Sequence, residues 1–504
     1  MKKRTILPAT LALALLLGLA PSARGGTYKA IQCYERSGAG HADAAYDSSS
    51  QHYSRSADCE GKGLGVAHKP GSNRTGSGKF GAWTLTAPAG TTIVRAAARV
   101  DASSQQFHVP QVLIGLEGGA RDLLDGIRGD LHTVDWEGAG GSYFSGRLVC
   151  VNRQDCGPGK DAYLYMRRIG LTLDDVTAPT LQLGGTLLDP GSRRGDQVLD
   201  VTTADTGSGV RSVTVEVNGQ PLDTRTLDCQ VKDDVAVRLR PCPGAPTPSF
   251  DIATTGAQFR QGPNELTVCS SDFSPEATAN TTCETRTIRI DNACPISPVP
   301  GTVLRARFKG AGERMTAPSN ATATVTGKLT DAGGAPIRDA KVCVATRVAT
   351  TDGPPERVMA TPTTSSKGRF RTRLKAGPSR EVRVAHWYGP HEVTERFLDL
   401  NAKAVPRLSV RPDQVHNGQT VRFEVRIPGP SQANRRIAIQ ARGTGKWIRI
   451  DGGRTDRGGR WSGKYRFKRT TGTKTYSFRA TIRRQPGYPY APGHSKTRRV
   501  TVTG

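Results

Sequence analysis

Residues 213–219 read Val-Thr-Val-Glu-Val-Asn-Gly, and this stretch decides the class of fold. Apolar and polar side chains alternate over the first five residues, which is the pattern of a β-strand with one buried face. Asn218 and Gly219 then supply the residue pair that a two-residue hairpin turn favours, because both residues tolerate positive φ. We therefore expect an antiparallel β-hairpin at this place.

The same pattern recurs along most of the chain. With 58 Gly and 32 Pro in 504 residues, long helices are disfavoured and frequent turns are favoured. A hydrophobic content of 36% is low for a compact enzyme but suits small sandwiches with thin cores. We predict an all-β fold of tandem antiparallel β-sandwich domains, jelly-roll and Ig-like. The expected strands include residues 80–88, which end on a turn signal, 91–100, 112–116, 162–166, 169–173, 262–269, 288–292, 324–329, 340–344, 421–425, 436–440, 476–480 and 498–504.

The first half divides into two expected domains at Asp174–Pro179, a turn-rich segment. Residues 26–176, with their alternating runs, resemble the lectin-like jelly-roll sandwiches of secreted bacterial proteins. Residues 177–293 resemble a bacterial immunoglobulin-like domain. That resemblance rests on the D-x-T-A-P entry at Asp175–Pro179, on Ala204–Val210 and on the hairpin that follows.

The second half divides after the proline-spaced linker Pro295–Pro300. Within residues 294–403, Gly334–Ile337, Ala340–Val344 and Thr364–Phe370 together resemble a carboxypeptidase-regulatory-like, or transthyretin-like, sandwich. This resemblance implies a non-catalytic accessory module. Residues 404–504 are expected to form a basic Ig-like sandwich. Their Gly-Arg-aromatic step, which ends at Trp461, repeats one in the preceding module, so the two are either related or share convergent turn chemistry.

The first 25 residues have the organisation of a secretory signal peptide. Lys2, Lys3 and Arg4 form a positive start, Ile6–Ala20 is uncharged and apolar, and small residues follow up to Gly25. An uncleaved signal anchor is the alternative. No later segment has enough consecutive apolar residues for a transmembrane helix. We predict a secreted, extracellular protein that can associate with the cell envelope.

The ten cysteines agree with export. Their number is even and none forms a C-x-x-C pair, so disulfides are favoured over zinc sites in an oxidising compartment. Many connectivities are possible, and we predict pairing of nearest neighbours. The last of these pairs would cross a predicted boundary strand. The predicted pairs are Cys33–Cys59, Cys150–Cys156, Cys229–Cys242, Cys269–Cys283 and Cys294–Cys343.

Charge is distributed very unevenly. The net charge is +27, and residues 401–504 alone hold 24 Lys and Arg against 4 Asp and Glu. Such a basic end attracts polyanions. An anionic envelope polymer is one interpretation, and an arginine-rich face that is merely solvated is the other. Nucleic acid is not expected, because the chain is exported and shows no known binding module. Tyr465 and Phe467 in the basic run Lys464–Arg469 share a face, which we expect to be the core.

The sequence contains no recognisable catalytic motif. The chain has no G-x-S-x-G elbow, and His391-Glu392 does not continue into H-E-x-x-H. Asp135-Trp136-Glu137 is the tightest acidic–aromatic cluster. Its carboxylates would share one face of a strand, which suits the pair of a retaining glycosidase poorly. We expect an exposed acidic edge with Trp136 in the core.

Acidic residues lie near turns of the second domain and at its entry, which is one arrangement that can bind calcium. Oxygen-rich loops suit Ca²⁺, whereas Asp in a turn usually bonds its own backbone. We therefore predict no metal-binding, cofactor-binding or catalytic residues. The acidic residues considered are Asp174, Asp175, Asp200, Asp205 and Asp272.

Two functional hypotheses follow from the sequence. The first is a secreted or envelope-associated, adhesin-like binding or structural protein without catalysis, whose basic C-terminal half contacts anionic envelope polymers. The alternative is a carbohydrate-active protein, either a glycoside hydrolase or a lectin, with its site in the N-terminal sandwich.

Overall fold

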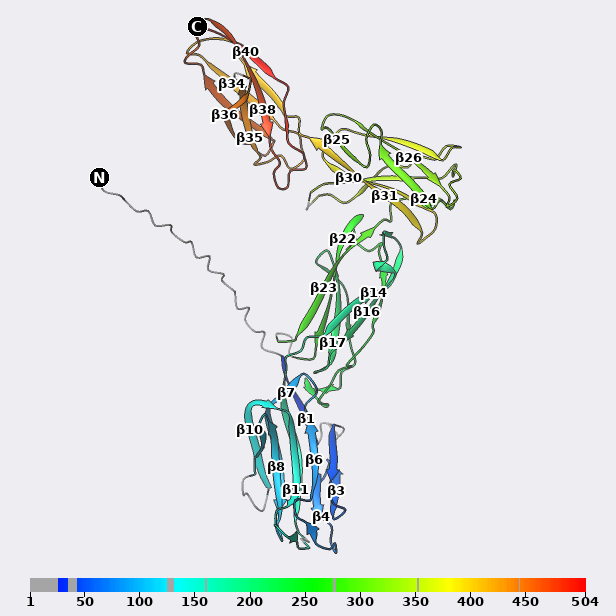
Figure 1. Cartoon of the computed structure of the whole chain (residues 1–504), viewed down its shortest axis with the longest axis vertical. Coiled ribbons are helices and arrows are strands. Elements are labelled where there is room, and N and C mark those ends of the chain that lie inside the picture. The colour runs from blue at the N-terminus through cyan, green and yellow to red at the C-terminus, as the bar shows by residue number, and fades with distance from the viewer. Residues whose placement is uncertain are drawn as a thin grey trace, which may run out of the picture.

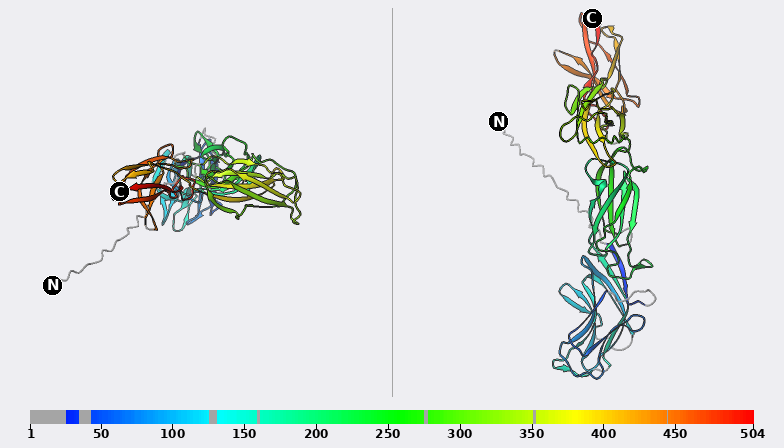
Figure 2. Two further views of the ribbon diagram at one scale, coloured as in Figure 1. Left: turned by 90° about the horizontal axis from the view of Figure 1, so that it is seen from above. Right: turned by 90° about the vertical axis from the view of Figure 1, so that its right-hand side faces the viewer.

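The computed structural model describes residues 26–34, 43–124, 131–158, 161–274, 278–350, 353–443 and 445–504. The predicted signal peptide, residues 1–25, lies outside these ranges. The described residues form strands, with one short 3₁₀ helix, η1 (Thr186–Leu188), and no α-helix. The all-β class is as predicted. The strands build four sandwiches that follow one another along an elongated molecule (Figures 1 and 2).

The first sandwich packs an eight-stranded sheet against a five-stranded one. The large sheet contains β10 (Leu131–Gly141), β7 (Thr91–Ser103), β13 (Tyr163–Asp175), β1 (Gly26–Gln32), β20 (Val235–Ala236) and β19 (Val231–Lys232), with β4 (Gly63–His68) on β13 and β3 (Tyr53–Asp58) on β4. The other sheet has the order β2 (Ala44–Ser48), β6 (Phe80–Thr86), β11 (Tyr143–Cys150), β8 (His108–Leu116) and β9 (Gly119–Asp122). A small ladder joins β12 (Asp155–Cys156) to β5 (Thr75–Gly76).

Strand β13 corrects one prediction. The runs at 162–166 and 169–173, expected as separate strands, form one strand with a β-bulge. Arg168 has a φ of 54°, and the register with β7 shifts between Arg167 and Gly170. The bulge changes which residues face the core, so Met166 and Ile169 are both buried although they are three positions apart. In the sequence, this change in the alternation of buried and exposed residues looks like a turn between two strands.

The second sandwich has a three-stranded and a five-stranded sheet. The orders are β14 (Thr180–Gly184), β16 (Asp196–Ala204), β21 (Ser249–Ala253), and β15 (Ser192–Arg193), β23 (Thr281–Ile290), β22 (Gly262–Asp272), β17 (Val210–Val217), β18 (Gln220–Thr226). The expected hairpin joins β17 to β18, and Asn218 and Gly219 have φ values of 54° and 71°. Such values at both central residues are those of the turn that the sequence predicted.

The third and fourth sandwiches repeat this plan. The third has β24 (Val303–Phe308), β26 (Ala323–Thr330), β29 (Arg369–Leu374), and β25 (Arg314–Pro318), β31 (Val393–Lys403), β30 (Arg380–Trp387), β27 (Cys343–Val348), β28 (Arg357–Ala360). The fourth has β32 (Arg407–Arg411), β34 (Thr420–Arg426), β37 (Arg460–Arg466), and β33 (Gln414–His416), β40 (Arg498–Thr503), β38 (Thr473–Ile482), β35 (Arg436–Arg442), β36 (Trp447–Arg454), with β39 (Gly493–His494) on β38. Taken in chain order, the strands of the second, third and fourth sandwiches occupy equivalent places.

Candidate functional site

Cations lie directly opposite one another on the outer face of small sheets. In the fourth sandwich, Arg426 on β34 lies between Arg407 on β32 and Arg460 on β37. A second row joins Arg411, Arg422 and Lys464, and Glu424 is the acidic residue between the rows. Directly paired residues of antiparallel strands point to the same side, and like charges placed so are destabilising.

The third sandwich carries a similar row. Lys328 on β26 lies between Arg305 on β24 and Arg369 on β29, and Arg307 and Arg371 flank Thr326 one step away. All of these positions are exposed or half-buried, whereas the alternate residues form the core. The fold therefore maintains like-charge rows on two successive sandwiches.

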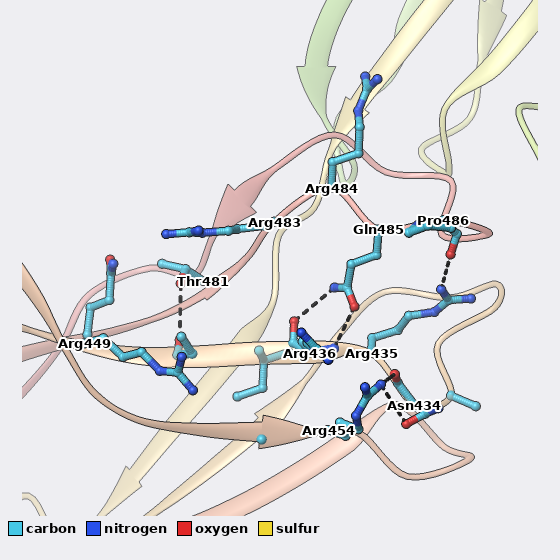
Figure 3. A pocket seen from close by; sticks show the side chains of 15 residues that line it. Asn434, Arg435, Arg436, Arg449, Arg454, Thr481, Arg483, Arg484, Gln485 and Pro486 are labelled. Atoms are coloured by element: carbon cyan, nitrogen blue, oxygen red, sulfur yellow. Dashed lines mark hydrogen bonds between the residues drawn. The ribbon is translucent and has the colours of Figure 1, made fainter. Parts of the chain in front are cut away.

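A basic cleft lies beside the large sheet of the fourth sandwich. A cleft of about 950 Å³ lies along β35, β36 and the chain after β38. None of the described residues that line it is acidic. Figure 3 shows its arginines, which we call the arginine cleft: Arg435, Arg436, Arg449, Arg454, Arg483 and Arg484.

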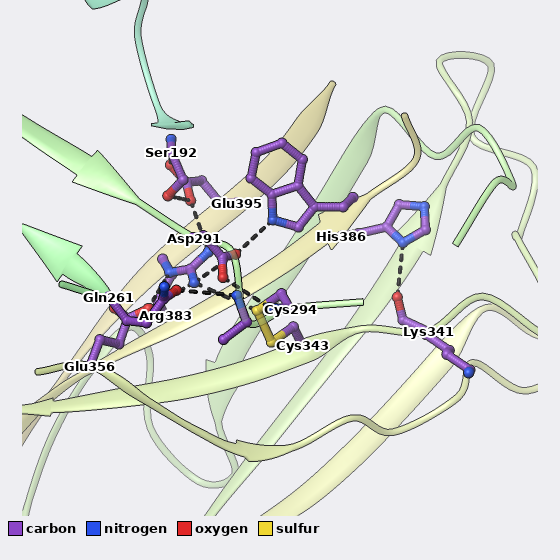
Figure 4. Close-up of a disulfide and its surroundings, with 12 residues drawn as sticks. Ser192, Gln261, Asp291, Cys294, Lys341, Cys343, Glu356, Arg383, His386 and Glu395 are labelled. Atoms are coloured by element: carbon purple, nitrogen blue, oxygen red, sulfur yellow. Dashed lines mark hydrogen bonds and ion pairs between the residues drawn. A yellow bond between two sulfur atoms is a disulfide. The ribbon is translucent and has the colours of Figure 1, made fainter. Parts of the chain in front are cut away.

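A buried ion-pair network joins the second and third sandwiches (Figure 4). The Arg383 side chain is 1% exposed, and its Nη2 lies 2.8 Å from Asp291 Oδ2 and 2.7 Å from Glu356 Oε1. Its Nη1 lies 3.4 Å from Glu395 Oε2. Burial opposes the charge, but the three carboxylates outweigh it and raise the pKa of Arg383. The Trp387 indole N–H also donates to Asp291, at 2.6 Å.

Further links make this junction a fixed one. Arg289 of the second sandwich pairs with Glu356 and Glu381 of the third, and the Ser192 hydroxyl donates to Glu395. The Cys294–Cys343 disulfide lies beside the network. This network could not be predicted from the sequence, since its members come from distant segments and carry no spacing signal.

The first and second sandwiches are joined by a docking segment, residues 229–242. Its strand β20 pairs with β1 in the sheet of the first sandwich through Ala30 and Ala236. Leu239 lies in the core of the first sandwich, and its carbonyl oxygen accepts a hydrogen bond from the Tyr28 hydroxyl, with 2.6 Å between the two oxygens. The Cys229–Cys242 disulfide closes the segment. Part of the chain expected in the second domain thus completes the first sandwich.

Three of the acidic residues weighed for calcium meet at this junction. Asp175 accepts bonds from the Thr177 and Ser208 N–H groups, Asp205 from Gly209, and Asp272 from Asn280. Burial raises the pKa of Asp205, and it raises that of Asp272 to about 7. Backbone and side-chain amide N–H groups donate to these carboxylate oxygens. The three aspartates therefore help to hold the two sandwiches together at this junction.

The remaining two acidic residues lie apart, Asp200 bonded to Ser249 on the neighbouring strand and Asp174 on β13. No group of three or more His, Cys, Asp or Glu that could hold a metal ion occurs among the described residues.

The acidic–aromatic cluster of the first sandwich does not form a catalytic pair. Asp135 and Glu137 are exposed on the edge strand β10, and Trp136 is buried. Asp135 pairs with Arg95 at 2.7 Å, and the hydrogen bond with this arginine lowers its pKa. A general acid would need a raised pKa instead.

The basic run of the fourth sandwich has its aromatic residues in the interior. Phe467 is buried, and Tyr465 packs against the same core. Phe467 is therefore not available as a stacking platform for bases, and Tyr465 is partly covered. All ten cysteines form the five nearest-neighbour disulfides.

A histidine cluster in the first sandwich was also missed by sequence reasoning. His68 and His108 are buried with ring centroids 4.4 Å apart, and His52 and His68 both lie within 3.3 Å of the Thr75 hydroxyl. Burial and the neighbouring histidines lower the pKa of His68 to about 4. Its Nδ1 is buried without a hydrogen-bond partner.

Comparisons with known proteins leave the function open. No protein-family model matches the sequence, and no curated protein matches it. A Salmonella alpha-2-macroglobulin is 12% identical, with a TM-score of 0.20, over 92% of this chain and 32% of that chain. The chain thus spans about a third of the length of the macroglobulin.

Two further solved structures are similar at the same low level. A tetra-tandem repeat in the extending region of a large adhesion protein is 13% identical, with a TM-score of 0.21, over 85% of this chain and 96% of that chain. A glycosyl hydrolase family 2 member from Bacteroides cellulosilyticus is 7% identical, with a TM-score of 0.15, over 95% of this chain and 100% of that chain. Similarities at such TM-scores do not indicate a function.

Within the part of the chain that the structure describes, no helix has the length and apolar character needed to span a bilayer.

Proposed function

We propose that the protein is a secreted, non-catalytic binding protein of the cell envelope, whose third and fourth sandwiches hold anionic polymers. The observation that carries this proposal is the like-charge rows. In Arg407–Arg426–Arg460 and Arg305–Lys328–Arg369, each cation lies directly opposite another on the neighbouring strand. Such pairs cost stability, of the order of 0.2–1 kcal/mol each.

A face that only needed solvation would gain from alternating charges, because opposite charges across strands stabilise a sheet. A polyanion lying along the rows would remove the repulsion and release its own counterions. Export is supported by the N-terminal sequence and by the five disulfides, which are typical of oxidising compartments. The domain ranges and family resemblances predicted above are part of this proposal.

Sedimentation with isolated cell envelopes tests the proposal. The mature chain should bind at 50 mM NaCl and be released at 500 mM, because screening weakens contacts with exposed charges. A chain ending at residue 405 should be retained far less, although residues 303–403 keep the core of their own sandwich. Equal recovery of both chains in the supernatant at either salt concentration would contradict the proposal.

A further inference from the structure

The arginine cleft has a rigid frame. The Gln485 side chain bonds the backbone of Arg436 on both sides, accepting from its N–H at 2.8 Å and donating to its carbonyl at 3.0 Å. Arg435 donates to the carbonyls of Ser431, Pro486 and Gly487. The loop after β38 is thereby fixed against the start of β35, as the dashed lines in Figure 3 show.

Two of the six arginines serve this frame, and the other four are available. Arg454 donates to the backbone and side-chain oxygens of Asn434, as Arg435 does to its loop. The guanidinium groups of Arg436, Arg449, Arg483 and Arg484 make no hydrogen bond or ion pair within the described part of the chain, and all four side chains are exposed. Unused donors on a fixed frame distinguish this cleft from a flexible basic surface.

The chemistry of the lining selects oxyanions. Every basic residue of the cleft is arginine, whose planar fork donates two parallel hydrogen bonds to a carboxylate or phosphate, whereas lysine acts as a point charge. No aromatic side chain is among the lining residues. Single-stranded nucleic acid is normally held by aromatic stacking, so the lining favours a polymer recognised through its charged groups alone.

The cleft continues toward the other sandwiches. A second cleft of about 720 Å³ shares Arg484 and Gln485 with it and reaches Arg260 of the second sandwich and Arg347 of the third. Its lining also includes one acidic residue and two aromatic ones, Glu265, Tyr488 and Tyr490. In Figure 3, Arg484 points away from strand β35 and from the remaining arginines. A basic track that extends beyond one cleft suits an extended polymer better than a single small anion.

We infer that the arginine cleft is a specific site for the carboxylate or phosphate groups of an extended anionic glycopolymer, and that the like-charge rows only add diffuse attraction. This inference rests on the proposed function and deepens it. It assigns recognition to guanidinium geometry at Arg436, Arg449 and Arg483.

The test uses the full mature chain and three triple variants. In the cleft, Arg436→Gln, Arg449→Gln and Arg483→Gln remove three charges, and the corresponding Lys variant keeps them. The control, Arg407→Gln, Arg426→Gln and Arg460→Gln, removes three charges from the opposite sheet. All six side chains are exposed, so we expect every variant to stay folded, and the control, which removes two like-charge pairs, to melt at the same or a slightly higher temperature. Affinity is measured by calorimetry for polygalacturonate, for poly(glycerol phosphate) and for single-stranded DNA.

The cleft Gln variant should lose about 30-fold or more in affinity for the carboxylate or the phosphate polymer, and the control only a few-fold. The Lys variant should lose about fivefold or more despite its unchanged charge, since lysine cannot form the bidentate contact. The two glycopolymers separate carboxylate from phosphate as the preferred group.

Equal losses in the cleft and control variants, or full affinity in the Lys variant, would overturn the specific site while leaving the proposed function intact. If the cleft bound single-stranded DNA more tightly than either glycopolymer, the assignment of a glycopolymer as its ligand would be wrong. No binding of any polyanion by the unaltered chain at low salt would instead reject the proposed function.

Discussion

Arginine serves two opposite purposes in this chain, and burial separates them. Arg383 is enclosed by Asp291, Glu356 and Glu395, so its charge is balanced within the fold. Arg436, in contrast, has an exposed guanidinium group and no acidic neighbour in its cleft. Composition counts both residues equally, which is why the net charge alone could not identify a site.

Replacing Arg383 by Met should destabilise the junction by about 3–5 kcal/mol, because it leaves buried carboxylates without a partner. Urea unfolding followed by tryptophan fluorescence measures the effect, because Trp387, one of the five tryptophans of the chain, donates to Asp291 at the junction. Arg314→Gln is the control. It breaks an ion pair whose side chains are 85% and 57% exposed, and such pairs contribute about 0–1 kcal/mol. Equal effects of the two changes would contradict the assigned role of Arg383.

Acid should weaken the first sandwich through His68. Its folded-state pKa is about 4, below the ordinary value of 6.5, so the unfolded chain binds the proton first. The stabilisation is complete above pH 6.5 and is lost as pH falls toward 4. Neighbouring His52 and His108 and the Thr75 hydroxyl offer no negative charge that would compensate.

Calorimetric melting between pH 4 and 7 provides the measurement. His68→Gln should flatten the pH dependence of the melting temperature of the first sandwich. His416→Gln, at an exposed position of the fourth sandwich, should leave that pH dependence unchanged. A steep dependence that persists in His68→Gln would assign the effect to other groups.

At the scale of elements, local patterns were predictable and partner-dependent ones were not. The β17–β18 hairpin follows from Val213–Gly219, because alternation and turn chemistry lie within seven residues. Strand β20 pairs locally with β19, but its place in the sheet of the first sandwich could not be predicted, since it depends on β1, some 200 positions earlier. The arginine cleft was likewise hidden, because it depends on the registers of β35 with β36 and β38. Only the excess of charge at that end was visible in sequence.

The docking segment should loosen when its disulfide is removed. In Cys229→Ala/Cys242→Ala, we expect faster hydrogen exchange at residues 231–239, because a closed loop then gains freedom. Cys269→Ala/Cys283→Ala is a matched control, since the two disulfides span 13 and 14 residues and each should contribute about 3 kcal/mol of loop entropy.

In the control variant, exchange at 231–239 should stay slow, since Cys269 and Cys283 lie opposite each other on the paired strands β22 and β23 of the second sandwich. Similar exchange in both variants would show that the segment docks independently of its disulfide.

As a whole, the molecule separates its basic sandwiches from its first sandwich along its length. The first sandwich lies at one end and the C-terminus at the other (Figures 1 and 2). Residues 1–293 hold nearly equal numbers of acidic and basic side chains, 31 and 30, whereas residues 294–504 hold 13 and 41. A chain bound through its basic end would therefore present the first sandwich away from the surface.

Lysine footprinting on polyanion-coated beads can verify this orientation. Lys446 and Lys464 of the fourth sandwich should be protected from an amine-reactive label in the bound state, whereas Lys29 and Lys62 of the first should react as in free protein. High salt should abolish the difference by releasing the chain. Uniform protection along the chain would contradict end-on attachment.

The Cys294–Cys343 bridge has a mechanical consequence. When such a protein is anchored at one end and pulled at the other, tension runs through the covalent backbone and takes the shortest route. The bridge bypasses 49 residues, a contour length of about 170 Å at full extension. Strands β24 to β26 therefore lie outside the load path, and the third sandwich can yield under shear flow only through its later strands.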